Sequence, residues 1–404
     1  MKILLLNQVF YPDVVATAQY LTDLATELSA QGHEVTVVSG RRAYEHPETI
    51  YSARETWRGV KILRVYSTRF GKGAKWRRAA DFASFLISCC ARLLFLRRHD
   101  VVLALTTPPL ISFIGAWRAK LWGARFCYWV MDFNPDEAIA AGWLRADSFA
   151  AKFLERLSRF SLRQADSIIA LDRFMRDRIV AKGIAPEKIF VIPPWSQEDE
   201  VRFDAAGREK FRAAHGLTKK FVVMYSGNHS PVHPLDTLMQ AAERLRGETD
   251  IVFCFVGGGS EFARVKKWAA ETGNQQVLCL PYQPLDQLSS SLSAADVHVV
   301  VMGDAMLGLV HPCKIYNILS VAAPVVYVGP KTSHVTEILE GLQPSHPWIG
   351  VPHGAAEALA TQIQELRVKT PVLDRRPLVA VAERYSQTTL LPQLVAMLEK
   401  DTAG

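Results

Sequence analysis

The sequence has few of the features that cross-link or anchor a protein. It contains only six cysteines, which lack the paired spacing of metal sites, and five of them lie in apolar runs. We therefore expect reduced thiols buried in protein cores. The first apolar stretch stops at Asn7, which is too short for a secretory signal peptide and favours a first strand. No stretch reaches the roughly 20 uninterrupted apolar residues of a membrane-spanning helix, so we expect a cytoplasmic protein.

The composition excludes further classes of protein. The chain has no low-complexity segment and no repeat at a fixed period, and 49% of its residues are hydrophobic against 22% charged, as in globular proteins. Its 404 residues are too many for one core, which predicts two domains of roughly 150 to 200 residues each. No acidic cluster indicates a divalent metal site, so we expect no metal and no cofactor.

What the chain does have is an excess of positive charge. The net charge of +7 favours an anionic partner, which includes nucleic acid, an acidic membrane surface and a phosphorylated substrate. Between residues 69 and 98 a single acid, Asp81, stands among eight basic residues that flank the apolar run from Phe82 to Phe95. The basic residues are Arg69, Lys72, Lys75, Arg77, Arg78, Arg92, Arg97 and Arg98.

This basic segment, residues 69–98, has two interpretations. One is an amphipathic surface that docks peripherally on the anionic inner face of the cell membrane. The other is an internal helix with arginines at its ends. Aromatic residues that would stack on bases are not interleaved with the charges across a groove, so we expect no nucleic acid partner.

Short β-rich apolar runs alternate with helical patterns along both halves of the chain. The first half predicts strands at 2–6, 34–39, 101–105 and 126–131, and the second half at 221–226, 251–256, 277–280 and 297–302. This alternation predicts an α/β protein with two Rossmann-like, doubly wound parallel sheets. A proline-rich stretch ending at Trp195 and the polar residues 196–208 separate an N-terminal domain, 1–195, from a C-terminal domain, 196–380. Such domains face a cleft, and ligands bind at the carboxyl ends of the strands.

The strongest local signal is the loop from Tyr225 to Asp236, which follows a strand and precedes a helix. Backbone amides around Gly227 and Asn228 would present N–H groups to an anion such as a nucleotide diphosphate. His229 and His233 could add hydrogen bonds or positive charge. The alternative is an ordinary turn that Asp236 caps.

Two further loops follow the next strands. The run from Val256 to Ser260 contains three glycines without the spacing of a dinucleotide fingerprint, which argues against a hydride-transfer cofactor. The turn that contains Tyr282 and Gln283 offers a ring on which a nucleobase could lie, although a plain turn would have a similar sequence.

Two charged residues, Lys314 and Asp132, are candidates for binding or catalysis because of their positions in predicted elements. Lys314 falls in the first turn of a predicted helix, where it opposes the helix dipole unless an anion lies beside it; the alternative is a solvated surface lysine. Asp132 follows an apolar strand and could hydrogen-bond a sugar hydroxyl or act as a catalytic base. Alternatively, Asp132 or Asn134 only caps the next helix.

At these residues the sequence resembles glycosyltransferase family 4, whose members have the GT-B fold and transfer sugars with retention at the anomeric carbon. The run Phe10-Tyr-Pro12 and the run Gly32-His-Glu-Val-Thr-Val37 look like the opening of that family. Thr107-Pro-Pro109 and Asp132-Phe-Asn-Pro-Asp-Glu137 look like a subgroup that builds surface polysaccharides. The likeness runs along nearly the whole chain.

The resemblance implies roles for particular residues. Asn228 and His233 stand at about the places of the family's diphosphate-binding arginine and lysine, the turn of Tyr282 and Gln283 lies beside the base, and the helix at Lys314 holds ribose and phosphate. The small residues Ala16 and Thr17 let a phosphate approach. Leu309 and Asn317 replace the family's paired glutamates; Asn317 can still bond the ribose. The run Ala382-Glu-Arg-Tyr-Ser386 resembles the start of a final helix, 381–404, that returns to the N-terminal domain.

These observations predict a retaining hexosyltransferase. It would transfer a sugar from a nucleoside diphosphate sugar, UDP-linked, to a hydroxyl of a lipid-linked or polysaccharide-precursor glycan. Lys314, His233 and the amides around Gly227 would stabilise the departing diphosphate, with Asp132 at the acceptor. Two alternatives stay open: a GT-B sugar-nucleotide epimerase or hydrolase, and a non-catalytic nucleotide-sugar-binding scaffold, which the missing glutamates favour.

Overall fold

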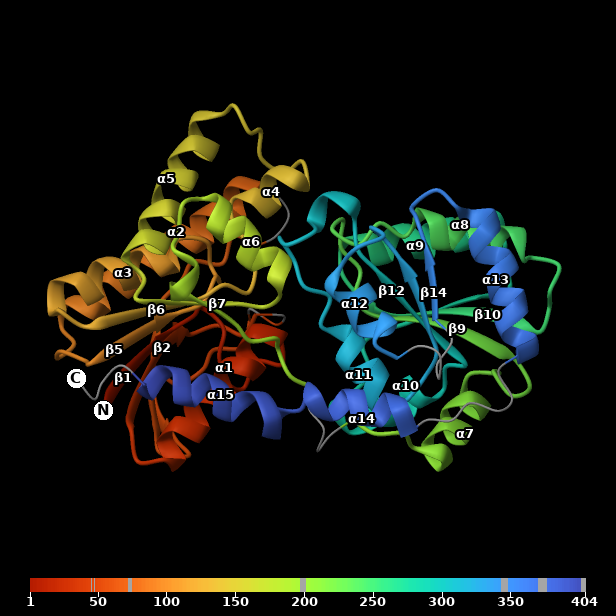
Figure 1. Ribbon diagram of the computed structural model, residues 1–404, viewed down its shortest axis with the longest axis horizontal. Helices are drawn as coiled ribbons and strands as arrows, with labels where there is room; N and C mark the ends of the chain where they lie inside the picture. The colour runs from red at the N-terminus through yellow and green to blue at the C-terminus, as the bar shows by residue number, and fades with distance from the viewer. Residues whose placement is uncertain are drawn as a thin grey trace. The chain divides into compact units, whose positions relative to one another are not determined.

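The computed structural model describes residues 1–400 except 45, 47, 72–74, 197–200, 343–347 and 370–375. Lys72 of the basic segment and part of the expected linker therefore lie outside the described residues. The chain forms two compact units (Figure 1). Unit 1 comprises Met1–Pro193, Gly308–His311 and the helical end of the chain from Leu391, and unit 2 comprises Pro194–Leu307 and Pro312–Leu390.

Unit 1 is built on an eight-stranded sheet with the order β3-β4-β2-β1-β5-β6-β7-β8. All neighbouring strands are parallel except β3, which runs antiparallel to β4 at the edge. The central strands are buried on both faces, which explains their continuous apolar sequences. The bounds are β1 (Lys2–Leu6), β2 (Glu34–Gly40), β3 (Arg54–Trp57), β4 (Val60–Val65), β5 (Val101–Ala104), β6 (Arg125–Trp129), β7 (Ser167–Ala170) and β8 (Ile189–Val191).

The helices of unit 1 cover both faces of this sheet. The connection from β1 to β2 leads toward one edge of the sheet, whereas the connections from β4 through β8 lead toward the other edge. Because such crossovers are right-handed, α1 lies on one face of the sheet, and the opposite face carries α2, α3, α5 and α6 (Figure 1). The end of α15 joins this unit, because Arg125 Nη1 donates to Leu398 O at 2.8 Å. The bounds are α1 (Ala16–Ala30), α2 (Lys75–Leu94), α3 (Ile111–Trp122), α4 (Asp136–Ala140), α5 (Phe149–Gln164), α6 (Arg173–Ala181) and α15 (Gln387–Glu399).

Unit 2 repeats the same plan with an all-parallel sheet in the order β11-β10-β9-β12-β13-β14. Its strands are β9 (Phe221–Asn228), β10 (Ile251–Gly258), β11 (Val277–Leu280), β12 (Val297–Val301), β13 (Val325–Val328) and β14 (Trp348–Val351). Its helices are α7 (Ala205–Ala214), α8 (Asp236–Arg244), α9 (Ser260–Thr272), α10 (Leu288–Ser293), α11 (Lys314–Ser320), α12 (His334–Glu340), α13 (Ala356–Lys369) and α14 (Arg376–Arg384). The expected alternation of strands and helices is thus confirmed in both halves.

Helix α2 carries most of the basic segment on the surface of unit 1. Phe85, Cys89 and Leu93 are buried at helical spacing, whereas Trp76 and Ile87 are 62% and 70% exposed. The interpretation of this segment as an internal helix is therefore wrong. Within the described residues, the structure contains no helix with the length and apolar content needed to cross a membrane.

The cysteines are free thiols, as the sequence predicts. Cys89, Cys127 and Cys254 are buried, and the other three are partly buried. Each occupies a packing position rather than a bridge.

Candidate anion-binding site

The site in unit 2 begins where β9 and β10 end side by side. The two strands pair up to Gly227 opposite Gly257 and Asn228 opposite Gly258. Gly227 and Gly257 have φ values of +127° and +137°, which favour glycine, and a Cβ on Gly257 would collide with the carbonyl oxygen of Gly227. Because these residues have no side chains, the backbone at the carboxyl end of the sheet stays open to a ligand.

Lys314, the first residue of α11, points its amine at this backbone. Nζ lies 3.5 Å from the position that a Cβ on Gly227 would take and 3.5 Å from the centroid of the Tyr225 ring. Nζ is buried and has no hydrogen-bond partner among the described residues. Burial lowers the pKa of this amine to about 7. The interpretation as a solvated surface lysine is therefore wrong.

Two histidines in the loop after β9, the buried His229 and the partly buried His233, each have a buried ring nitrogen without a hydrogen-bond partner among the described residues. His229 Nδ1 lies 2.9 Å from the carbonyl oxygen of Gly227, and its Nε2 has no partner in the described part of the chain. The ring of His233 bonds the backbone of Val301, and its Nδ1 also has no hydrogen-bond partner in the described part of the chain. Burial, and then the charge of Lys314, lower the pKa of His229 to about 4 and that of His233 to about 3.

The three unpartnered nitrogens, Lys314 Nζ, His229 Nε2 and His233 Nδ1, form what we call the nitrogen cluster. A buried polar group without a partner costs roughly 1 to 3 kcal/mol, and more when it is charged. Three such nitrogens in one place are able to pair with an anion. Asp236, the alternative cap of this loop, does not cap α8: Leu235 is the N-cap residue, and Asp236 pairs with Arg264 at 2.7 Å.

The other predicted donor residues lie at the same edge of unit 2. The Tyr282 ring is 49% exposed and packs on Gly258, where a Cβ would come within 2.9 Å of the ring. Gln283 donates from Nε2 to Pro281 O at 2.9 Å, which shapes that turn. Asn228 is exposed at the end of β9, and Asn317 is half-buried one turn along α11 from Lys314. The structure thus brings Gly227, His233 and Lys314 together and flanks them with the Tyr282 ring.

In unit 1, the predicted catalytic residue Asp132 lies just beyond β6. Its backbone N–H donates to Thr106 Oγ1 at 3.3 Å, and neither Asp132 nor Asn134 caps α4, whose N-cap is Pro135. Burial raises the pKa of Asp132 to about 6. Burial and the neighbouring Asp132 raise the pKa of Glu137 to about 8, against a smaller opposing effect of Arg78. Two half-buried carboxyl groups that share this environment can hold or pass a proton.

Unit 1 also has a cavity of about 100 Å³, which Asn134 and Ala138 line but neither carboxyl group does. It is mostly apolar, with hydroxyl and amide groups at Thr106, Ser112 and Asn134. Ala16 and Thr17 begin α1 elsewhere in unit 1, after the N-cap residue Val15, which makes no side-chain cap bond. The helix therefore presents its first backbone N–H groups without competition from a cap.

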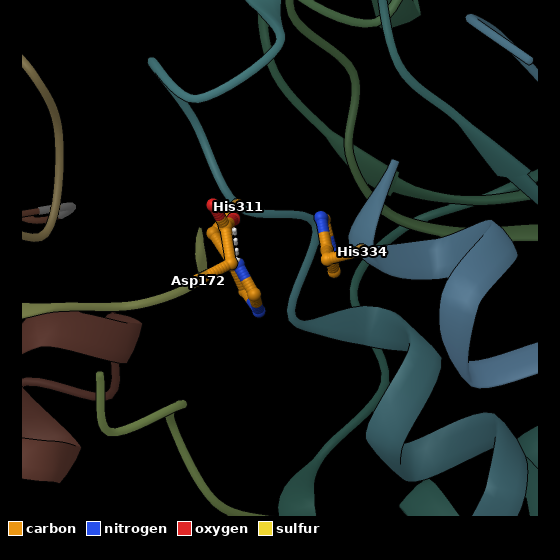
Figure 2. A group of neighbouring side chains, drawn as sticks. All are labelled: Asp172, His311 and His334. Atoms are coloured by element: carbon orange, nitrogen blue, oxygen red, sulfur yellow. Dashed lines mark hydrogen bonds and ion pairs between the residues drawn. The ribbon is translucent and has the colours of Figure 1, made fainter. Parts of the chain in front are cut away.

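Leu309 and His311 occupy a short segment, Gly308–His311, that belongs to unit 1. Leu309 is buried, and its carbonyl oxygen accepts from Phe133 N at 3.0 Å, so it has a packing role. His311 Nδ1 lies 2.8 Å from Asp172 Oδ2, and both side chains are buried (Figure 2). Figure 2 also draws His334, which is the first residue of α12 in unit 2.

The comparisons with known proteins agree with this arrangement. Residues 16–195 match the model of the glycosyl transferase 4-like domain, and residues 207–366 match that of glycosyl transferases group 1. The chain belongs to glycosyltransferase family 4. The resemblance noted in the sequence is thereby confirmed.

Two curated relatives are similar over most of their length. A putative colanic acid biosynthesis glycosyl transferase of Escherichia coli (strain K12), WcaI, is 27% identical over 361 residues, which cover 84% of this chain and 86% of the relative. A probable glycosyltransferase of Pseudomonas aeruginosa, WbjE, is 27% identical over 301 residues, which cover 74% of each chain.

Among solved structures, Anabaena HepE in complex with UDP-glucose has a similar fold. The TM-score is 0.72 at 16% sequence identity, and the match covers 99% of this chain and 100% of HepE. The fold is GT-B, as predicted, and the chain is a glycosyltransferase of that type.

Three residues of the site were missed or left without a role by sequence reasoning. Tyr225 lies under the Lys314 amine, Glu137 has a pKa that burial and the neighbouring Asp132 raise, and Asp172 pairs with His311. Only Glu137 had a signal, because it belongs to the Asp132–Glu137 motif. The other two depend on contacts between residues far apart in sequence.

Proposed function

We propose that this glycosyltransferase transfers a hexosyl group, with retention, from a UDP-linked sugar to an acceptor hydroxyl. The observation that carries the proposal is the nitrogen cluster, whose three nitrogens have no hydrogen-bond partner among the described residues and can pair with the charge of a diphosphate. Charge-assisted hydrogen bonds from an ammonium group to phosphate oxygens are among the strongest in proteins. The same groups would stabilise the charge that develops on the diphosphate as the sugar departs.

UDP is the nucleotide that the surroundings support best. The fold neighbour HepE binds UDP-glucose, and the exposed Tyr282 ring beside Gly258 offers a face on which a flat pyrimidine can stack. Asn317 stands within a turn of Lys314 and carries an amide suited to ribose hydroxyls. A thermal-shift screen against UDP, GDP, ADP and dTDP tests this choice, because only a bound nucleotide raises the melting temperature.

Retention follows from a front-face displacement in this proposal. The bond between the anomeric carbon and the phosphate oxygen breaks, the acceptor oxygen bonds to the same face, and the acceptor proton moves to the departing phosphate. Asp132 is proposed to orient the acceptor hydroxyl. We propose no metal and no cofactor for this reaction, since Lys314 and protonated histidines supply the positive charge.

We further propose that the acceptor is a lipid-linked or polysaccharide-precursor glycan met at the inner face of the cell membrane. Helix α2 supports this because it exposes Trp76 and Ile87 together with Arg77 and Arg78. Apolar side chains that enter the headgroup region and arginines that attract anionic lipids are the two components of peripheral docking. The curated relative WcaI is named for colanic acid biosynthesis.

Product analysis tests the reaction itself. The purified chain is incubated with a UDP-sugar and a membrane glycolipid extract, and the fate of the sugar is followed. Transfer to the extract supports the proposal. Free sugar or an epimerised UDP-sugar would identify the hydrolase or epimerase, and an intact but bound UDP-sugar would identify the scaffold.

A further inference from the structure

We propose that the diphosphate of the donor binds together with protons, which are taken up by the Lys314 amine, His229 Nε2 and His233 Nδ1. This inference rests on the proposed function of the nitrogen cluster and adds a property to it. Donor affinity would then fall as the pH rises, and His229 would join His233 as a binding residue.

The hydrogen bonds of His229 decide which nitrogen carries its proton. Nδ1 faces the carbonyl oxygen of Gly227 at 2.9 Å, and a carbonyl oxygen can only accept. In the neutral ring the single proton therefore lies on Nδ1, and Nε2 presents a lone pair. A phosphate oxygen would be repelled by that lone pair, so His229 can contact the donor only after a second proton is bound.

His233 repeats this arrangement with the opposite nitrogen. Its bond to the backbone of Val301 involves Nε2, because Nδ1 has no partner among the described residues. The neutral ring therefore also turns a bare lone pair into the site. An arginine at this position would stay protonated and bind an anion without any proton exchange, whereas a histidine makes proton uptake part of binding.

Within the described part of the chain, no carboxylate contributes to the pKa shift of Lys314. The groups around the cluster are Tyr225 on β9, Tyr282 after β11, His298 on β12 and Cys313 before α11. Among the described groups that shift the pKa values of Lys314, His229 and His233, none is a carboxylate. Burial lowers the pKa of Lys314 to about 7, so the charge of a bound diphosphate would raise this pKa and favour the ammonium form.

The test is isothermal titration calorimetry of the full chain with UDP-glucose and with UDP, at pH 6 in MES and Bis-Tris and at pH 8 in HEPES and Tris. The two buffers at each pH differ in ionisation enthalpy. The phosphates of UDP-glucose do not titrate in this range, and UDP is fully ionised at pH 8. We expect uptake of about one proton at pH 8. For each proton taken up, binding should weaken about tenfold with every rise of one pH unit.

Matched variants assign the protons. Lys314→Arg should remove the uptake at pH 8, because the guanidinium group stays charged. His229→Gln and His233→Gln should each lower the uptake at pH 6, while His46→Gln, which changes an exposed histidine of unit 1, should leave both values unchanged.

Two outcomes would overturn the inference in different ways. Binding of UDP or UDP-glucose with equal enthalpies in both buffers at both pH values would leave the proposed donor site standing and refute proton uptake. No binding of either nucleotide would refute the donor site itself, and the inference with it.

Discussion

At the scale of single residues, Lys314 places an amine in a buried position, where the charged form is destabilised by the loss of water. Its buried amine has only the Tyr225 ring beneath it, and a cation–π contact offsets part of the desolvation. Lys314→Met keeps the length and removes the charge. We expect a Kd for the UDP-sugar that is weaker by about 10- to 100-fold. The ligand-free protein should become more stable by about 1 kcal/mol at pH 7, because a buried unpaired charge is lost.

Weaker donor binding together with higher stability of the ligand-free protein would show that Lys314 is a binding residue and not a structural one. Calorimetry gives the Kd, and thermal unfolding without ligand gives the stability. Lys210→Met, which changes an exposed lysine on α7 of the same unit, is the control. A destabilised Lys314→Met variant with unchanged affinity would contradict the role assigned to Lys314.

Glu137 gives unit 1 a pH-dependent stability. Burial raises its pKa to about 8, so its neutral form fits the folded state better than its charged form does. Its contribution to stability is therefore complete below its ordinary pKa and is lost as the pH rises through about 8. Glu137→Gln should raise the stability on the order of 1 kcal/mol at pH 9 and change little at pH 4.

Unfolding curves of the Glu137→Gln variant and the wild type between pH 4 and pH 9 check this prediction. Glu365→Gln, at an exposed position of α13, should leave the pH profile as it is. A larger benefit of Glu137→Gln at low pH than at high pH would reverse the sign and refute the account.

The sequence predicts the positions of Lys314, in the first turn of a helix, and of His233, in the loop after a strand, and the structure has both residues there. The sequence cannot show that their nitrogens lack partners, since this depends on which neighbours fold around them. Tyr225 illustrates the limit: it reads as a core strand residue, and the structure adds the amine above its ring.

At the scale of elements, the paired ends of β9 and β10 depend on glycine. Gly257→Ala places a methyl group against the carbonyl oxygen of Gly227 at a backbone φ of +137°. We expect a loss of about 1 to 3 kcal/mol in stability and weaker donor binding, because the displaced carbonyl belongs to the residue that Lys314 faces. Gly247→Ala, where a Cβ meets no atom within 4 Å, is the control. Equal unfolding midpoints for the two variants would contradict the packing described.

Helix α2 is the element proposed to meet the membrane. Changing Trp76 and Ile87 to Glu removes two exposed apolar groups of α2 and adds negative charge without touching the buried face. We expect co-sedimentation with vesicles of 30% anionic phospholipid to weaken by about 10-fold or more. Val368→Glu, at a 74% exposed position of α13 in unit 2, should bind as the wild type does. Unchanged binding of the α2 variant would exclude this surface.

The elements themselves were largely readable from the sequence. Continuous apolar runs with turn residues between them gave the strands, because parallel strands are buried on both faces. Their ends were less predictable: β9 continues two residues beyond the expected 226, since Gly227 and Asn228 still pair with β10. The surface position of α2 depends on which elements pack against it. The number of apolar residues in its sequence could not distinguish a surface helix from an internal one.

At the scale of the whole molecule, the two units divide the work of a GT-B glycosyltransferase. Unit 2 carries the nitrogen cluster and the Tyr282 ring, and unit 1 carries the carboxyl pair and the exposed face of α2. The net charge of +7 suits both an anionic donor and an anionic surface. Sugar transfer by this protein should therefore depend on Lys314.

The most direct measurement follows a radiolabelled UDP-sugar in the presence of a membrane glycolipid extract, with wild type, Lys314→Met and Lys210→Met compared side by side. The account predicts label in the glycolipid fraction for the wild type and Lys210→Met, and at least about a tenfold loss for Lys314→Met. Label that stays in a nucleotide sugar or appears only as free sugar, or transfer that is equal in all three proteins, would contradict it.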